Sequence, residues 1–300
     1  MPSGSVALFL TEAQNRYQQL LHADAVRHAE QTGIVLEVSF CSLGVARQVE
    51  QLRAVIGRPA GERPRAVMVL PAEDASMREL AREVAAAGVG WVLLNRSAAF
   101  LDRLPYEFPK LPIFTVSPND HEIGKVQGRQ LRAALPRNAR VLLARGGSGP
   151  TAVDREVGLR SALTGSQIGV DVLYGSWAFQ GASKALDKHF SMAARKSARL
   201  DAIACQNDEI ALAAVEALER AAARLARAEL GRVEVFGCDG LPDVGQRYVR
   251  EGKFRATVVV PPTTGAAIQA LANAFERGTQ PPAELNVPCT ALPSERELKR

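Results

Sequence analysis

Short apolar segments rich in β-branched residues alternate along the whole chain with longer amphipathic segments. A short apolar run bounded by turn residues is typical of a buried strand, and apolar residues three or four positions apart are typical of a helix. In the first half the predicted strands are Val6–Leu10, Val35–Ser39, Ala66–Leu70, Gly90–Leu94 and Ile113–Val116. In the second half they are Val141–Ala144, Val170–Tyr174, Ala202–Cys205, Val233–Phe236 and Ala256–Val260. Repeated strand-helix units predict parallel sheets and therefore an α/β fold.

Helix boundaries support this interpretation. The clearest predicted helices are Arg16–Gln31, Ser76–Ala87 and Glu209–Arg227. Gly33 and Gly88 follow the first two, where glycine readily ends a helix. Asn207 and Asp208 precede the third, and a short polar side chain there can cap the free N–H groups of the first turn.

A chain of 300 residues is too long for one ordinary core and suits two lobes, each with its own sheet. The composition, 47% hydrophobic and 23% charged, is that of a globular protein. The first ten residues lack the charged region, long apolar stretch and cleavage site of a secretory signal, so we expect either that a signal was removed or that the protein stays inside the cell. The net charge of +5 is scattered, and its densest cluster, Arg195–Arg199, is interpreted as a solvated helix end rather than a nucleic-acid site.

Motifs for catalysis and for cofactors are missing from the sequence. The cysteines Cys41, Cys205, Cys238 and Cys289 form no C-x-x-C pair and are interpreted as small buried apolar residues, although Cys205 and Cys238 lie near strand ends that could be neighbours. The Gly146–Gly149 loop lacks the spacing of dinucleotide and phosphate loops and of a nucleophile elbow. We therefore expect no cofactor and no enzyme activity. An enzyme of nucleoside or sugar metabolism, the alternative from another class, would need a nucleophile or a metal site.

Polar and aromatic residues follow most of the predicted strands. They are Asn15 and Tyr17 after the first strand, Asn95 and Arg96 after the fourth, Arg155 beyond the sixth, Trp177 after the seventh, Asn207 after the eighth and Asp239 after the ninth. In open parallel sheets, ligands bind just beyond the carboxyl ends of the strands. Amide, guanidinium and carboxylate groups suit hydroxyl groups, and aromatic faces suit C–H surfaces. The combination predicts a site for a small sugar.

Two stretches carry a family resemblance: Asp201–Leu212, which reads Asp-Ala-Ile-Ala-Cys-Gln-Asn-Asp-Glu-Ile-Ala-Leu, and Phe236–Asp243, followed by Glu251-Gly252-Lys253. Asn119–Gly124 and Asp154–Leu159 support it. In this order and spacing, the chain from about Val6 to about Cys289 resembles the ribose- and galactose-type periplasmic sugar-binding proteins. It is also similar to the effector-binding cores of lactose-repressor-type regulators.

The resemblance implies that the eight residues named above contact the ligand, with Tyr17 and Trp177 as the stacking aromatics. Two positions depart from the family pattern. Gln18 replaces the second aromatic residue of the first loop, and Val260 stands where a polar hinge side chain usually touches the ligand. The ligand is thus left open among a pentose, a hexose, a deoxy sugar and a related polyol.

The resemblance also implies a fold of two doubly wound parallel-sheet lobes joined by a three-crossing hinge. The first lobe would hold residues 1–118 and 261–288, and the second residues 119–260 and 289–300. Hinge closure would bury the sugar in a cleft between the lobes. The closed protein, expected to be a monomer, would then deliver the sugar to an ABC-type permease in the periplasm.

Sensing is the alternative that the same resemblance leaves open. The chain could serve a membrane sensor, or be the sensing domain of a sensor kinase or of a lactose-repressor-like regulator without its output domain. A regulator's DNA-binding domain would occupy about 50 residues before Val6, where five are present, so we expect no nucleic-acid partner. If no signal peptide precedes the chain, a cytoplasmic sensor becomes the alternative to a periplasmic location.

Overall fold

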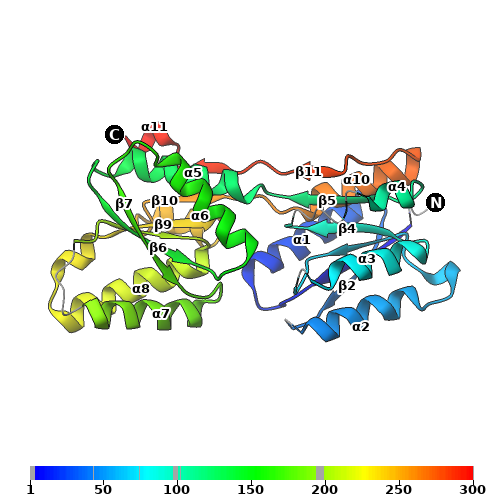
Figure 1. The fold of residues 1–300 in the computed structure, drawn as a ribbon, viewed down its shortest axis with the longest axis horizontal. Helices are drawn as coiled ribbons and strands as arrows, with labels where there is room; N and C mark the ends of the chain where they lie inside the picture. The colour runs from blue at the N-terminus through cyan, green and yellow to red at the C-terminus, as the bar shows by residue number, and fades with distance from the viewer. Residues whose placement is uncertain are drawn as a thin grey trace. The chain divides into compact units, whose positions relative to one another are not determined.

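The computed structural model describes residues 4–42, 44–73, 75–96, 101, 103–193 and 199–299. It divides the chain into two compact units: unit 1 holds Met1–Pro118 and Pro262–Val287, and unit 2 holds Asn119–Pro261 and Pro288–Arg300. Pro261 and Pro288, which we expected in the first lobe, belong to unit 2. Each unit contains one six-stranded sheet with helices on both faces (Figure 1). The predicted doubly wound α/β fold is thereby confirmed.

The sheet of unit 1 is parallel throughout. Its strands are β1 (Ser5–Leu10), β2 (Val35–Phe40), β3 (Ala66–Val69), β4 (Gly90–Leu94), β5 (Ile113–Ser117) and β11 (Glu284–Asn286). They lie in the order β11-β5-β4-β3-β1-β2, with Val6 of β1 opposite Leu36 of β2 and Ala66 of β3. Because all strands run the same way, the loops that follow β1, β3 and β4 gather at one edge of the sheet.

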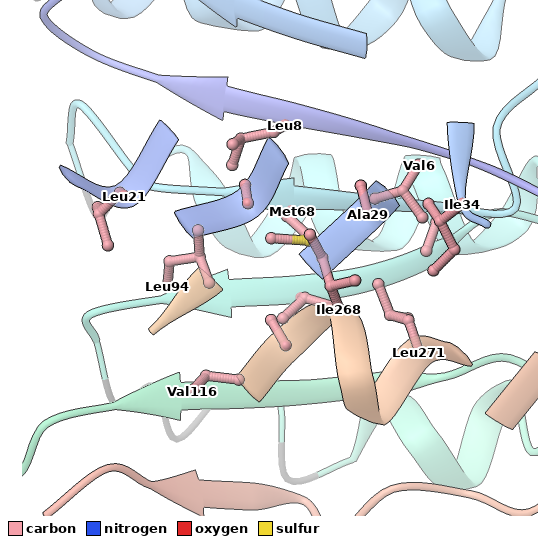
Figure 2. Packing of buried hydrophobic residues seen from close by; sticks show 14 of the residues in the cluster. Val6, Leu8, Leu21, Ala29, Ile34, Met68, Leu94, Val116, Ile268 and Leu271 are labelled. Atoms are coloured by element: carbon pink, nitrogen blue, oxygen red, sulfur yellow. The ribbon is translucent and has the colours of Figure 1, made fainter. Parts of the chain in front are cut away.

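Helices cover both faces of this sheet because alternate strand residues point to opposite sides. The helices of unit 1 are α1 (Arg16–Thr32), α2 (Val45–Ile56), α3 (Met77–Ala86), α4 (Leu104–Glu107), α10 (Thr264–Arg277) and the 3-10 turn η1 (Ala60–Glu62). Leu8 faces α1 and α10, whereas its neighbour Phe9 packs with residues of α2 and α3. Figure 2 shows the first of these cores, in which Leu21 and Ala29 of α1 and Ile268 and Leu271 of α10 lie against Leu8, Met68 and Leu94 of the strands.

Unit 2 repeats this plan with one antiparallel edge. Its strands are β6 (Arg140–Arg145), β7 (Gly169–Tyr174), β8 (Ala202–Cys205), β9 (Glu234–Asp239), β10 (Ala256–Val259) and β12 (Thr290–Leu292), in the order β12-β10-β9-β8-β6-β7. Only the pairing of β12 with β10 is antiparallel among these described strands. The helices are α5 (Asp120–Ala134), α6 (Pro150–Ala162), α7 (Phe179–Ala193), α8 (Asp208–Leu225), α9 (Gly245–Arg250), α11 (Glu295–Leu298) and the 3-10 turn η3 (Ala228–Arg232). α5 and α6 supply core residues on one face, and α7 and α8 on the other.

All ten predicted strands are present, and most of their bounds differ from the prediction by one residue. The largest difference is at β9, which continues through Asp239 instead of ending at Phe236. β11 and β12 were not predicted, because three residues are too few to show a strand period. Of the predicted basic helix end, positions 195–198 lie outside the described residues. Arg199 is described, and its Nε lies 2.9 Å from Oδ1 of Asp201.

Three of the four cysteines are buried, as predicted, and Cys289 is half-buried. Cys205 packs in the core with α7 and α8, whereas Cys238 packs with Ile123 and Val126 of α5. The two cysteines therefore lie on opposite faces of the sheet, although their strands are neighbours. In the part of the chain that the structure describes, no helix is long and apolar enough to cross a membrane.

Candidate ligand-binding site

Two glycines allow α5 and α6 to approach each other closely. A Cβ atom at Gly124 would lie 2.0 Å from the carbonyl oxygen of Arg155, and one at Gly158 would lie 2.0 Å from that of His121. Real side chains do not tolerate such distances, so both positions need glycine. At this crossing Nε of Arg155 on α6 donates to Oδ1 of Asp120 on α5 over 2.8 Å.

Arg155 is held inside unit 2 by several partners. Its Nη1 donates to the carbonyl oxygen of Gln206 over 2.5 Å and lies 3.4 Å from both Oδ1 of Asp239 and Sγ of Cys238. Burial lowers the pKa of the guanidinium, but nearby Cys238, Asp120 and Asp239 together raise it by more. The net pKa is therefore well above the usual value. The cation is therefore permanent, and two carboxylates stand beside it.

Asp239 is the last residue of β9 and has an unusual backbone. Its φ is 85°, and that of Gly240 is 59°. Left-handed φ angles are uncommon for residues other than glycine and often mark functional positions. Burial raises the pKa of the Asp239 carboxyl, while the charge of Arg155 and its hydrogen bond act in the opposite direction.

Gln206 and Asn207 tie the loops of unit 2 together. Gln206 accepts from Gly146 N at 3.1 Å and donates to the carbonyl oxygen of Ala152 at 2.8 Å. Asn207 caps α8 by accepting from Ile210 N at 2.8 Å, and its Nδ2 donates to the carbonyl oxygen of Trp177 at 2.9 Å. Since Nδ2 carries a second hydrogen, Asn207 can bind a ligand while it holds the Trp177 backbone.

The indole of Trp177 lies flat against the glycine loop after β6. A Cβ atom at Gly146 would lie 2.1 Å from Cδ2 of the indole, so only glycine leaves room for the ring. The guanidinium carbon of Arg155 is 5.7 Å from the ring centroid. The Gly146–Gly149 loop therefore seats an aromatic ring that is half-buried.

In unit 1 a chain of polar groups connects Tyr17, Asn95 and Thr263. Asn95 follows β4 with a φ of 56°, its Nδ2 donates to Tyr17 Oη at 3.1 Å, and its Oδ1 accepts from Thr263 Oγ1 at 2.7 Å. Arg96 Nη1 donates to the carbonyl oxygen of Asn95 at 3.0 Å. The fully buried Thr263 was not predicted, because it lies 168 residues from Asn95 in the sequence.

Asn15 and the two departures from the family pattern have structural roles. Asn15 caps α1 by accepting from Gln18 N at 3.1 Å. The amide of Gln18 is buried and binds Thr11 and Glu12 N, which fixes the loop after β1. Val260 is 2% exposed and packs in the α5 core, so this chain uses the position for packing.

The structure thus brings Tyr17, Asn95 and Arg96 together within unit 1, and joins Arg155 to Asp239 and Asn207 to Trp177 within unit 2. Asp120, the partner of Arg155, was not predicted as a site residue, although it lies in the Asn119–Gly124 stretch that carried the resemblance. Among the described residues, no group of three or more His, Cys, Asp and Glu side chains could hold a metal ion.

Comparisons with known proteins agree with this architecture. A family model described as periplasmic binding protein domain matches residues 6–279. No curated protein matches the sequence significantly. A periplasmic solute-binding protein of an ABC transporter from Actinobacillus succinogenes, solved with D-allose, is similar with a TM-score of 0.82 and 21% identity, over 98% of this chain and 99% of that one.

Two further solved structures have the same fold. The myo-inositol-binding protein of Caulobacter has a TM-score of 0.79 and 17% identity, over 99% of this chain and 95% of that one. The arabinose-transporter binding protein of Shewanella sp. ANA-3, bound to L-arabinofuranose, has a TM-score of 0.80 and 18% identity over the same shares of the two chains. At these identities the likeness establishes the fold.

Proposed function

The chain belongs to the periplasmic binding protein domain family, and on this premise we propose that it is a non-catalytic binding protein for a small, uncharged sugar or polyol. The observation that carries the proposal is the buried pair of Arg155 on α6 and Asp239, the last residue of β9. A guanidinium donates hydrogen bonds and a carboxylate accepts them. Side by side, the guanidinium can donate to one hydroxyl group of a ligand, and the carboxylate can accept from a neighbouring hydroxyl group.

The charges around Arg155 favour an uncharged ligand. Arg155 faces the two carboxylates of Asp120 and Asp239, so no positive charge remains unbalanced in this cluster for an acidic ligand. A sugar acid or sugar phosphate would bring a further negative charge beside Asp239. Like charges in a buried place are strongly unfavourable, which favours neutral polyols.

Two aromatic side chains supply apolar surface. Tyr17 and Trp177 are both half-buried, one in each unit. Aromatic faces suit the C–H surfaces of sugar rings. The similar proteins hold D-allose, myo-inositol and L-arabinofuranose, which supports the same class of ligand here and leaves the particular sugar to experiment.

Binding without turnover is part of the proposal. It is supported by family membership and by the buried arginine partner of Asp239, which suits this carboxylate to accept hydrogen bonds from a ligand. Incubation of the purified protein with each bound sugar, followed by chromatography, should return the sugar unchanged. A changed sugar would contradict this part of the proposal.

The proposed partner is an ABC-type permease, and the proposed compartment is the periplasm. Both follow from the family and from the similar transporter proteins. The protein is expected to act as a monomer that closes about its ligand. Small-angle scattering tests closure, because the radius of gyration should fall when the ligand is added and stay constant with a sugar that does not bind.

A thermal-shift screen tests the proposed function directly. A ligand that binds the folded state alone raises the melting temperature. The panel holds pentoses, hexoses, deoxy sugars, inositols, sugar phosphates and nucleosides, and calorimetry confirms each positive result. A shift with a neutral sugar or polyol supports the proposal, whereas a shift with sugar phosphates alone contradicts the choice of an uncharged ligand.

A further inference from the structure

Asp208, the first residue of α8, is buried within unit 2 with 0% exposure. Its Oδ2 accepts hydrogen bonds from Leu241 N at 2.7 Å and from Gly245 N at 3.2 Å. Its Oδ1 accepts from Thr257 Oγ1 at 3.4 Å. One side chain thus connects α8 to the turn after β9, to the start of α9 and to β10.

This position does not fit the role that the sequence predicted. Asn207 and Asp208 were both predicted as possible caps of this helix, but Asn207 is the cap, and it accepts from Ile210 N at 2.8 Å. The carboxylate of Asp208 points instead to a loop more than 30 residues further along the chain. Helix capping therefore does not explain why an acid is buried here.

Glycines on two sides make room for this carboxylate. A Cβ atom at Gly245 would lie 2.6 Å from both Oδ1 and Oδ2 of Asp208, and one at Gly237 would lie 3.0 Å from Oδ1. Neither glycine has a φ in the left-handed region, so backbone conformation is not what requires glycine at these positions. The carboxylate of Asp208 fills the space beside Gly245, and it shares the space beside Gly237 with Thr257 Oγ1 and the ring of Phe254.

The turn that Asp208 holds carries the proposed ligand residue Asp239. Asp239 and Gly240 both have left-handed φ angles, and Leu241 is the next residue. The carbonyl oxygen of Asp239 accepts from Val260 N at 3.0 Å, and that of Gly240 accepts from Gln246 Nε2 at 2.9 Å. Leu241 N donates to Asp208, so each of the three residues of the turn makes a hydrogen bond to a residue outside the turn.

We propose that Asp208 is a positioning residue of the ligand site: it fastens the 239–241 turn and thereby directs the Asp239 carboxylate toward Arg155 and the ligand. The proposal rests on the proposed function for the role of Asp239. The hydrogen bonds to the turn are independent of any ligand. Asp208 affects affinity through the turn and does not itself touch the ligand.

Two substitutions separate positioning from mere filling of space. Asp208→Asn keeps an acceptor for Leu241 N and Gly245 N and can donate to Thr257 Oγ1, whereas Asp208→Ala leaves all three groups without this partner. Burial, with a further contribution from the charge of Asp239, raises the pKa of the Asp208 carboxyl well above its usual value. An amide, which is uncharged, is therefore a close substitute for this acid.

Amide hydrogen exchange of the ligand-free proteins is the first test. In Asp208→Ala, the amides of Leu241 and Gly245 should exchange at least about tenfold faster than in the wild type. The reason is that the hydrogen bonds that must break before exchange in the wild type are absent from the variant. In Asp208→Asn they should stay protected, and the amides of Val235 and Phe236 within β9 should be unchanged in both variants. Unchanged exchange of Leu241 and Gly245 in the alanine variant would overturn the proposal.

Ligand affinity is the second test, with D-allose, L-arabinose and myo-inositol as probes. For each probe that binds the wild type, Asp208→Ala should weaken binding by about tenfold or more and Asp208→Asn by less than about threefold. Leu230→Ala, which removes a buried side chain of the 3-10 turn η3 before the start of β9, is the control for general destabilisation and should keep full affinity. Equal losses in Leu230→Ala and Asp208→Ala would contradict positioning.

Gly245→Ala provides a second test in case Asp208→Ala does not fold. Its added methyl group meets the Asp208 carboxylate, so it should likewise expose the Leu241 amide and weaken binding. If no probe binds the wild type, the exchange of Leu241 and Gly245 still decides whether Asp208 holds the turn, and the wider thermal-shift panel decides on the ligand class.

Discussion

Nη1 of Arg155 lies 3.4 Å from Oδ1 of Asp239, and the two side chains are only 9% and 11% exposed. Breaking a buried ion pair by removing one partner costs about 3–5 kcal/mol, because the remaining charge has no compensation. Arg155 also pairs with Asp120, so its loss would strand two carboxylates. Removal of either partner would therefore destabilise unit 2 as well as alter its proposed binding site.

Asp239→Asn is the milder test of this pair. The amide keeps the shape and one acceptor but loses the negative charge, so ligand affinity should fall by about 1–3 kcal/mol while the variant stays folded. Arg155→Ala should lose binding and also about 3–5 kcal/mol of unfolding free energy. Calorimetry and urea unfolding measure the two quantities, and full affinity in Asp239→Asn would show that the carboxylate does not bind the ligand.

The helix crossing of α5 and α6 predicts a strong dependence on two glycines. Gly124→Ala or Gly158→Ala should lower the free energy of unfolding by about 1–3 kcal/mol, because a methyl group would overlap a backbone carbonyl of the facing helix. Gly231→Ala in the same unit meets no atom within 4 Å and is the matched control. Urea unfolding of the three variants checks this, and similar losses in all three would refute the role of the crossing.

Trp177 should report ligand binding. Its half-buried indole is proposed to stack on the sugar, so Trp177→Ala should cost about 1–3 kcal/mol of binding energy. The second tryptophan, Trp91, is fully buried in unit 1, and Trp91→Phe leaves Trp177 as the single fluorophore of its type. In that variant the emission should change on titration with ligand, and a constant emission would argue against the stacking role.

Ligand affinity should weaken as the pH falls. Burial raises the pKa of Asp239, so its carboxylate becomes protonated at a higher pH than an ordinary aspartate and loses its charge as an acceptor. As the pH is lowered from neutral, the affinity should therefore begin to fall at a higher pH than it would with a solvated carboxylate. Calorimetry across this range tests the idea, and Asp239→Asn should bind with less dependence on pH.

His189 on α7 should lower the folding stability in mildly acidic solution. Burial lowers the pKa of this histidine in the folded state, while the charge of Asp171 raises it. The unfolded chain then binds a proton more readily, so stability is lost as the pH falls from about 6.5 toward the lowered value. His189→Gln should lose less unfolding free energy between about pH 7.5 and about pH 5.5, and an equal loss would show that other groups cause the effect.

Most of the fold follows from local sequence patterns. Runs such as Gly90–Leu94 and Ala202–Cys205 were predicted to the residue, because apolar runs between helices are a local signal of parallel strands. The same signal located polar residues at strand ends, among them Asn95 and Asp239. The family resemblance added their expected roles.

The partners of these residues were beyond a sequence-based prediction. Asn207 and Asp208 are neighbours with equally suitable cap side chains, and only the packing of the 239–241 turn decides that Asp208 turns away from its helix. The bond of Thr263 to Asn95 likewise joins atoms far apart in the sequence.

The sequence by itself determined the α/β class, the order of the ten longer strands and the polar positions that follow most of them, because these depend on the period of apolar residues and on short-range capping and turn preferences. The tertiary structure alone decided which of those polar groups pair: Arg155 meets Asp120 where two glycines bring α5 and α6 together, and Asp208 meets Leu241 where α8 passes the end of β9. A buried polar group must find a partner wherever the folded chain supplies one, and the sequence spacing does not specify that place.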